Sequence, residues 1–151
     1  MKTLSLLLMS LVGSLFFSMG VLKTKTPTHL QKMALLIHKK WKMSDETTFT
    51  NGKTTNTFKD YKACVTDDLI TFLPDGNLIL DDNKMRCANA QSQAIQTTIG
   101  IWAFNIQDKN KLEIAVTMQF TAEIMTINDN TLVWKYQNQV GDIVTQTFTK
   151  Q

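Results

Sequence analysis

Residues 64–87 read CVTDDLITFLPDGNLILDDNKMRC, and this stretch holds both cysteines of the chain and an Asp-Gly pair between two apolar runs. Asp-Gly in that setting favours a two-residue turn between antiparallel strands. In the resulting register Cys64 and Cys87 are directly opposite each other. Opposite residues have Cα atoms about 4.5–5.5 Å apart, which a disulfide tolerates. The stretch therefore predicts a disulfide-linked hairpin.

Other interpretations of this stretch remain open. A three-residue turn with a bulge at Pro74-Asp75-Gly76 would shift the pairing by one residue and make the cysteines diagonal neighbours. A reactive thiol or a metal site would need partners, but there is no CxxC, and both histidines (His29 and His38) lie near the N-terminus. We therefore expect a structural disulfide that stabilises the fold by about 3.5 kcal/mol.

The first twenty residues have the composition of a secretory signal peptide. Lys2 supplies a positive charge, residues 4–17 are almost entirely apolar, and small residues follow at Ser18 and Gly20. The apolar run is shorter than the roughly 20 residues of a membrane span. We expect removal of residues 1–20 rather than retention as an anchor, with 21–27 as a polar tether. No cysteine precedes residue 64, so we expect a soluble extracytoplasmic protein, periplasmic or secreted, that is not a lipoprotein.

Residues 28–151 have the patterns of one domain, which begins with a short helix. Thr28 and Gln31 form a capping-box pair at its start. Its apolar residues recur at helical spacing: Leu30, Met33, Ala34 and Ile37.

The remainder of the domain alternates apolar and polar residues between turn signals, which is typical of β-strands. Eight strands are predicted, at residues 41–43, 67–73, 77–81, 99–106, 111–119, 122–127, 131–137 and 143–150. Residues 45–62 are expected to be a frayed continuation of the first strand or a long loop. The order predicts an all-β fold: an eight-stranded antiparallel up-and-down barrel, closed or half-open.

Several short motifs occur in a characteristic order along this domain. They are Trp41-Lys42-Met43; Cys64, Asp67, Asp68, Thr71, Phe72, Asp75 and Gly76; Gly100-Ile101-Trp102; Leu112-Glu113-Ile114; and Thr131–Lys135 before a Thr-rich end. Together they resemble the lipocalin-like domain of bacterial secreted and surface proteins, from about Leu30 to the C-terminus. The resemblance implies a small up-and-down or half-open barrel with a helix before its first strand. Most members of that family have no known ligand.

The leading functional hypothesis is non-catalytic binding of a small apolar or amphipathic ligand in the barrel. Its candidate lining is the set of bulky residues expected to face inward: Phe72, Trp102, Phe104, Met118, Trp134 and Tyr136. A barrel of eight strands can instead be filled by such side chains. The alternative is therefore an extracytoplasmic protein–protein interaction module with a filled barrel, and an exposed apolar patch near Trp41 and the helix would favour it.

Other function classes lack a sequence signal. There is no Gly-x-Ser-x-Gly, no metal-spaced His or Cys cluster and no phosphate-binding glycine loop, so no enzyme, cofactor or metal is expected. The net charge of +3 falls by one when Lys2 leaves, which gives no electrostatic reason to expect nucleic acid. The acidic pairs Asp67-Asp68 and Asp81-Asp82 are interpreted as solubilising residues rather than a calcium site or a pair with a raised pKa.

Overall fold

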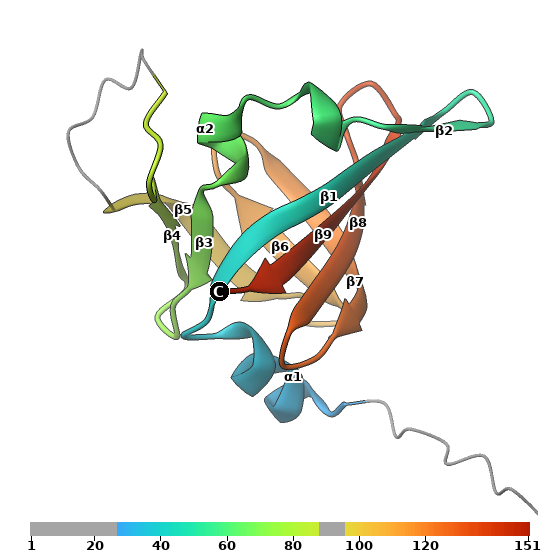
Figure 1. Ribbon diagram of the computed structural model, residues 1–151. Coiled ribbons are helices and arrows are strands. Elements are labelled where there is room, and N and C mark those ends of the chain that lie inside the picture. The colour runs from blue at the N-terminus through green and yellow to red at the C-terminus, as the bar shows by residue number, and fades with distance from the viewer. Residues whose placement is uncertain (1–26, 88–95) are drawn as a thin grey trace, which may run out of the picture.

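The computed structural model describes residues 27–87 and 96–151 (Figure 1). The expected signal segment 1–20 and nearly all of the tether 21–27 lie outside the described residues. The described residues form a closed barrel of eight antiparallel strands with one additional strand, and little helix. The predicted fold class is therefore confirmed. In the same residues no helix is long and apolar enough to cross a membrane.

Each barrel strand pairs with its neighbours in the sheet, and pairing of the first with the last closes the barrel. The strands are β1 (Lys40–Thr50), β2 (Lys53–Asn56), β3 (Leu69–Phe72), β4 (Asn77–Asp81), β5 (Gln96–Phe104), β6 (Lys111–Ala115), β7 (Gln119–Ile127), β8 (Thr131–Gln137) and β9 (Ile143–Lys150). The helices are α1 (His29–Leu36), the 3-10 helix η1 (Phe58–Asp60) and α2 (Ala63–Thr66). Figure 1 shows α1 across one end of the barrel, here called the lower end, and η1 and α2 at the upper end.

The segment 45–62 is more ordered than either expectation for it. β1 continues to Thr50 and turns back at Asn51-Gly52 into β2, which pairs with the upper half of β1. Asn51 and Gly52 have φ angles of 51° and 78°, as the tight turns favoured in hairpins require. η1 and α2 follow, so the chain passes over the upper end before it enters β3.

The β3–β4 hairpin has the three-residue turn, so the two-residue register is wrong. Leu69 is opposite Asp81, and Phe72 is opposite Leu78. Gly76, with φ 87°, takes the left-handed position at the end of the turn, where glycine avoids a steric penalty. The cysteines are consequently not partners within the strand ladder.

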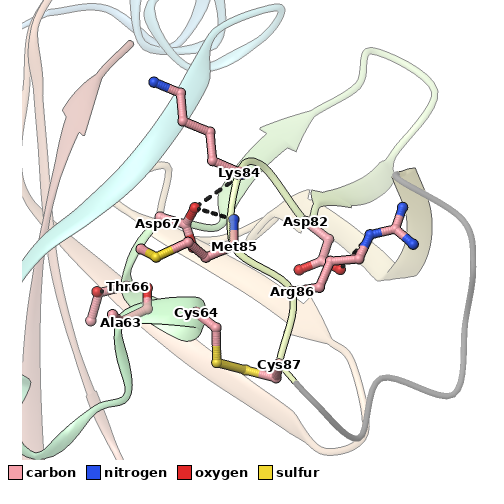
Figure 2. Close-up of a disulfide and its surroundings, with 9 residues drawn as sticks. All are labelled: Ala63, Cys64, Thr66, Asp67, Asp82, Lys84, Met85, Arg86 and Cys87. Atoms are coloured by element: carbon pink, nitrogen blue, oxygen red, sulfur yellow. Dashed lines mark hydrogen bonds and ion pairs between the residues drawn. A yellow bond between two sulfur atoms is a disulfide. The ribbon is translucent and has the colours of Figure 1, made fainter.

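The predicted disulfide is confirmed, although it joins different elements (Figure 2). Cys64 lies in α2 and Cys87 lies beyond β4, with Cα atoms 5.2 Å apart. Beside the disulfide, the Asp67 carboxylate accepts hydrogen bonds from the backbone N–H groups of Lys84 and Met85, at 3.0 and 2.9 Å. Two links therefore hold α2 against the segment that follows β4.

Helix α1 has the predicted capping box, and its packed face agrees with the predicted one only at Met33 and Ile37. The Thr28 side chain accepts from the Gln31 N–H, and the Gln31 side chain accepts from the Thr28 N–H. Lys32 and Leu36 are buried, whereas Leu30 is 77% exposed.

The predicted apolar stripe of α1 is thus wrong at Leu30, and Ala34 is also exposed. The Lys32 ammonium, donating to the Asn110 side chain, can enter the interface because it has a polar partner there. The Leu36 carbonyl also accepts from the Trp41 indole at 3.1 Å, which fixes the helix to β1.

Aromatic rings fill the lower half of the barrel. The Phe72 ring centroid lies 5.3 Å from that of Trp102 and 6.0 Å from that of Trp134, in edge-to-face arrangements. Phe104 packs against Trp102 and against the His29 ring of α1. This cluster and α1 close the lower end.

One predicted inward residue is not inside. The β6–β7 turn falls at residues 116–118 rather than at Phe120-Thr121, so β7 begins at Gln119. Met118 therefore lies in the turn and is 51% exposed. The alternation along 111–119 ends at Ala115, because the chain turns there.

Loss of the disulfide is expected to lower stability without changing the fold. For a loop with a sequence separation of 23, the loss is about 3.5 kcal/mol, because the unfolded chain regains loop entropy. Urea unfolding of the Cys64→Ala/Cys87→Ala double variant measures this. The oxidised protein plus reductant should give the same value, and equal stability of oxidised and reduced protein would contradict the prediction.

Candidate functional site

The barrel interior contains a cavity of about 220 Å³, which is lined from Val65 of α2 at the upper end to Trp41 near α1. Its walls come from seven strands and α2, and Gln146 and Asp68 are their polar residues. The apolar lining residues are Trp41, Met43, Val65, Ile70, Leu78, Leu80, Ile114, Val116, Phe120, Trp134 and Phe148. We call this space the barrel cavity.

A β-bulge in β1 decides which side chains of that strand face the interior. The register shifts between Met43 and Asp45. Below the bulge, Trp41 and Met43 line the cavity. Above it, Glu46 lies opposite the cavity-lining Gln146 and is only 6% exposed. An extra residue in one strand re-aims the following side chains in this way.

Glu46 is the centre of a buried polar network. Its carboxylate accepts hydrogen bonds from the Thr57 hydroxyl at 2.9 Å, the Tyr61 hydroxyl at 3.1 Å and the Gln146 amide at 2.6 Å. A buried carboxylate with several donors avoids much of the cost of burial. The network joins β1 and β9 to the segment that covers the upper end.

The orientation of the Gln146 amide is fixed by two different partners. The indole N–H of Trp134 can only donate, and it bonds to Gln146 Oε1 at 2.8 Å. The opposite atom, Nε2, therefore faces the Glu46 carboxylate. Among the described residues this leaves one N–H and one oxygen lone pair of Gln146 for a bound molecule.

The Glu46 carboxylate contributes to a raised pKa at both tyrosines of the chain. Burial, followed by the charge of Glu46 and a hydrogen bond to it, raises the pKa of Tyr61 to about 12. Burial and the same carboxylate also raise the pKa of Tyr136. In each case the neutral phenol is favoured because a phenolate would be partly buried beside an acid.

Asp68 is the charged residue in the cavity wall. Its Oδ1 atom is buried and, among the described residues, has no hydrogen-bond partner. Burial, followed by the charges of Asp82 and Asp67, raises the pKa of Asp68 to about 6. The expectation that these acids are only solubilising therefore fails for Asp68. It also fails for Asp67 and Asp81, which are each 6% exposed and accept hydrogen bonds.

The six residues predicted to line the cavity lie in four different places in the structure. Trp134 lines the barrel cavity. Phe72, Trp102 and Phe104 are buried in the aromatic cluster of the lower half. Tyr136 is half-buried at a second hollow, and Met118 is in the exposed turn.

The second hollow is a wide lateral groove of about 570 Å³ where β7 and β8 separate. Their ladder ends at Glu123 and Lys135, and beyond it the Phe120 and Tyr136 rings lie with centroids 4.5 Å apart. Phe120 belongs to both linings. Its ring therefore lies between the groove and the barrel cavity.

Sequence reasoning missed the Glu46 network, and one signal could have found part of it. The Asn51-Gly52 pair indicates a hairpin, which would have extended β1 past Glu46. The inward position of Glu46 depends on the bulge, which period-two alternation does not reveal.

No protein-family model matches the chain, and no curated protein and no solved structure matches it.

Tyrosine titration is expected to report the Glu46 network. In a Tyr136→Phe background, folded protein should show no tyrosinate absorbance near pH 10, because the pKa of Tyr61 is about 12. A raised folded-state pKa contributes stability below pH 10 that is lost as pH rises towards 12.

The matched variant is Glu46→Gln in the same background, which removes the charge and should lower the pKa of Tyr61. Urea-unfolded protein should titrate near pH 10 in both cases. Identical titration of Tyr61 with and without Glu46 would contradict the network.

Proposed function

We propose that the chain is an extracytoplasmic, non-catalytic protein that binds a small apolar or amphipathic molecule in the barrel cavity. The observation that carries this proposal is a cavity with almost wholly apolar walls and two polar groups, Gln146 and Asp68. Small-molecule sites typically combine apolar walls with a few placed polar groups. The order of motifs that resembles the lipocalin-like domain family also supports it.

The size of the cavity limits the ligand. About 220 Å³ lies below the roughly 300–1,000 Å³ of sites for drug-sized ligands. It exceeds the roughly 150 Å³ of an apolar cavity that accepts benzene. The proposed ligand is therefore a single ring or a short alkyl chain with one polar end, rather than a long-chain lipid.

The disulfide supports the proposed location. A disulfide between Cys64 and Cys87 is typical of proteins in an oxidising compartment. Together with the signal-like first twenty residues, it favours a periplasmic or secreted protein.

One observation that would have supported the interaction-module alternative is not made. An exposed apolar patch near Trp41 and the helix would have favoured it, but Trp41 is 0% exposed. Leu30 of α1 remains 77% exposed, and a single exposed leucine is ordinary. The cavity therefore favours ligand binding over a filled interaction module.

Tryptophan fluorescence tests the proposal, since Trp41 and Trp134 line the cavity. Phenethyl alcohol and hexanol are expected to give saturable changes, whereas oleate is not, because its chain exceeds the space. The Leu80→Phe variant, which fills part of the cavity, should bind about tenfold more weakly or worse.

The matched control is Ile101→Phe, which adds the same kind of ring at a 61% exposed position of β5. It should leave affinity unchanged. Absence of a saturable change with every probe would overturn the proposed function and favour the filled-barrel alternative.

A further inference from the structure

The barrel wall has a gap between the upper parts of β7 and β8. Their ladder ends at Glu123 and Lys135, although β7 begins at Gln119 and β8 continues to Gln137. Both strands stay paired on their other sides, β7 with β6 as far as Gln119 and β8 with β9 as far as Gln137. The lateral groove lies at this gap. The wall is therefore continuous on each side of the gap but not across it.

Backbone groups that face the gap have no ladder partner on the other side of it. Successive residues of an antiparallel strand direct their N–H and C=O groups to opposite neighbours. The Ile124 N–H donates towards the β6 side at 2.7 Å, and the Asn138 N–H donates towards the β9 side at 2.9 Å. Thr121 and Gln137 consequently direct their backbone groups into the gap. Separating the strands there breaks no hydrogen bond of the β7–β8 ladder.

Two aromatic rings close the gap in place of backbone hydrogen bonds. The Phe120 and Tyr136 rings are both half-buried, with centroids 4.5 Å apart. Phe120 lines the lateral groove on one side and the barrel cavity on the other. Side chains that are partly exposed change rotamer rapidly. A turn of the Phe120 ring is therefore enough to join the two spaces.

The two ends of the barrel are held more firmly than this gap. At the upper end the Cys64–Cys87 disulfide and two hydrogen bonds to Asp67 fix α2. At the lower end the aromatic cluster fills the barrel, and the Trp41 indole donates to the Leu36 carbonyl of α1. Passage through either end would disturb these links, whereas passage through the gap displaces a side-chain ring.

We propose that the ligand enters and leaves the barrel cavity laterally, through the gap between β7 and β8, and that the Phe120 ring is the gate. This inference rests on the proposed function above. The gate opens when the ring turns away from Tyr136, and the ligand then passes between Thr121 and Gln137. At about 570 Å³ the groove is larger than the cavity of about 220 Å³, so it can hold any molecule that fits the cavity.

Bridging the gap tests this route. In the Thr121→Cys/Gln137→Cys variant a short bismaleimide, which reacts with thiols and leaves the disulfide intact, joins the two strands. Fluorine NMR exchange of para-fluorophenethyl alcohol measures association and dissociation separately. The bridge should slow both rates about tenfold or more and leave Kd within about twofold, because it raises the barrier without changing the bound state.

The matched control carries the same bridge on an intact part of the wall. Ala103 and Glu113 are opposite each other in the β5–β6 ladder. The Ala103→Cys/Glu113→Cys variant, treated with the same bismaleimide, should exchange the ligand at the rates of the unaltered chain.

Removal of the gate should have the opposite effect and needs no chemical modification. The Phe120→Ala variant should associate with the ligand about tenfold faster, because no ring has to move. The control Phe49→Ala deletes the same ring at a 47% exposed position outside the lining of the cavity, and should leave the association rate unchanged.

The association rate decides between the outcomes. Association slowed by the bridge at 121 and 137 but not by the control bridge, together with faster association in Phe120→Ala, supports the inference. An association rate that neither the bridge nor Phe120→Ala changes relative to its control overturns the inference and leaves the proposed function standing. Absence of saturable binding of any probe to the unaltered chain overturns both.

Discussion

The β-bulge between Met43 and Asp45 is the constraint on which the rest of the barrel depends. β1 pairs with β3 below the bulge, with β2 above it and with β9 on both sides of it. Below the bulge β1 directs Trp41 into an apolar interior, and above it the strand directs Glu46 inward. One added residue thus brings a carboxylate to the interior side of a strand whose lower residues there are apolar.

The two halves have different physical roles. In the lower half aromatic rings pack edge to face, and α1 covers the end, so stability comes from burial. In the upper half the Glu46 carboxylate is hydrogen-bonded to its neighbours, and the Gln146 amide is held between Glu46 and Trp134. Asp68 is left with an unsatisfied oxygen beside other acids. A group that costs stability in the free protein is typical of a functional position.

The sequence predicted the strands well where alternation and turn residues agree. Strands β3, β4, β5, β8 and β9 were located because Asn, Asp or Gly residues mark their turns, whereas the β6–β7 boundary was misplaced because residues 116–118 contain none of these. The disulfide was predicted correctly from a register that proved wrong, because the turn has three residues. In addition, α2 rather than a strand carries Cys64. The sequence spacing correctly predicted that the two cysteines lie close together, but not that they are paired across two strands.

The candidate site was predicted much less well, for reasons that are physical. Aromatic residues are equally suited to filling a barrel and to lining a cavity, so Phe72 and Trp102 could not be assigned from sequence. Asp68 and Glu46 are placed by tertiary features, namely the α2 cover and the bulge. Polar residues that become buried through such features carry no periodic signal of their own.

The closing pair of strands also sets the order in which the chain can fold. β3 to β9 form hairpins from neighbouring segments, whereas the β1–β9 ladder joins Trp41 to Lys150, more than a hundred residues later. Such long-range closure is entropically slow. Until β9 arrives, β1 presents an unpaired edge and an uncovered tryptophan, which are the features that promote association between incomplete chains. The disulfide joins α2 to the segment after β4 and encloses only the β3–β4 hairpin, so oxidation can precede completion of the barrel.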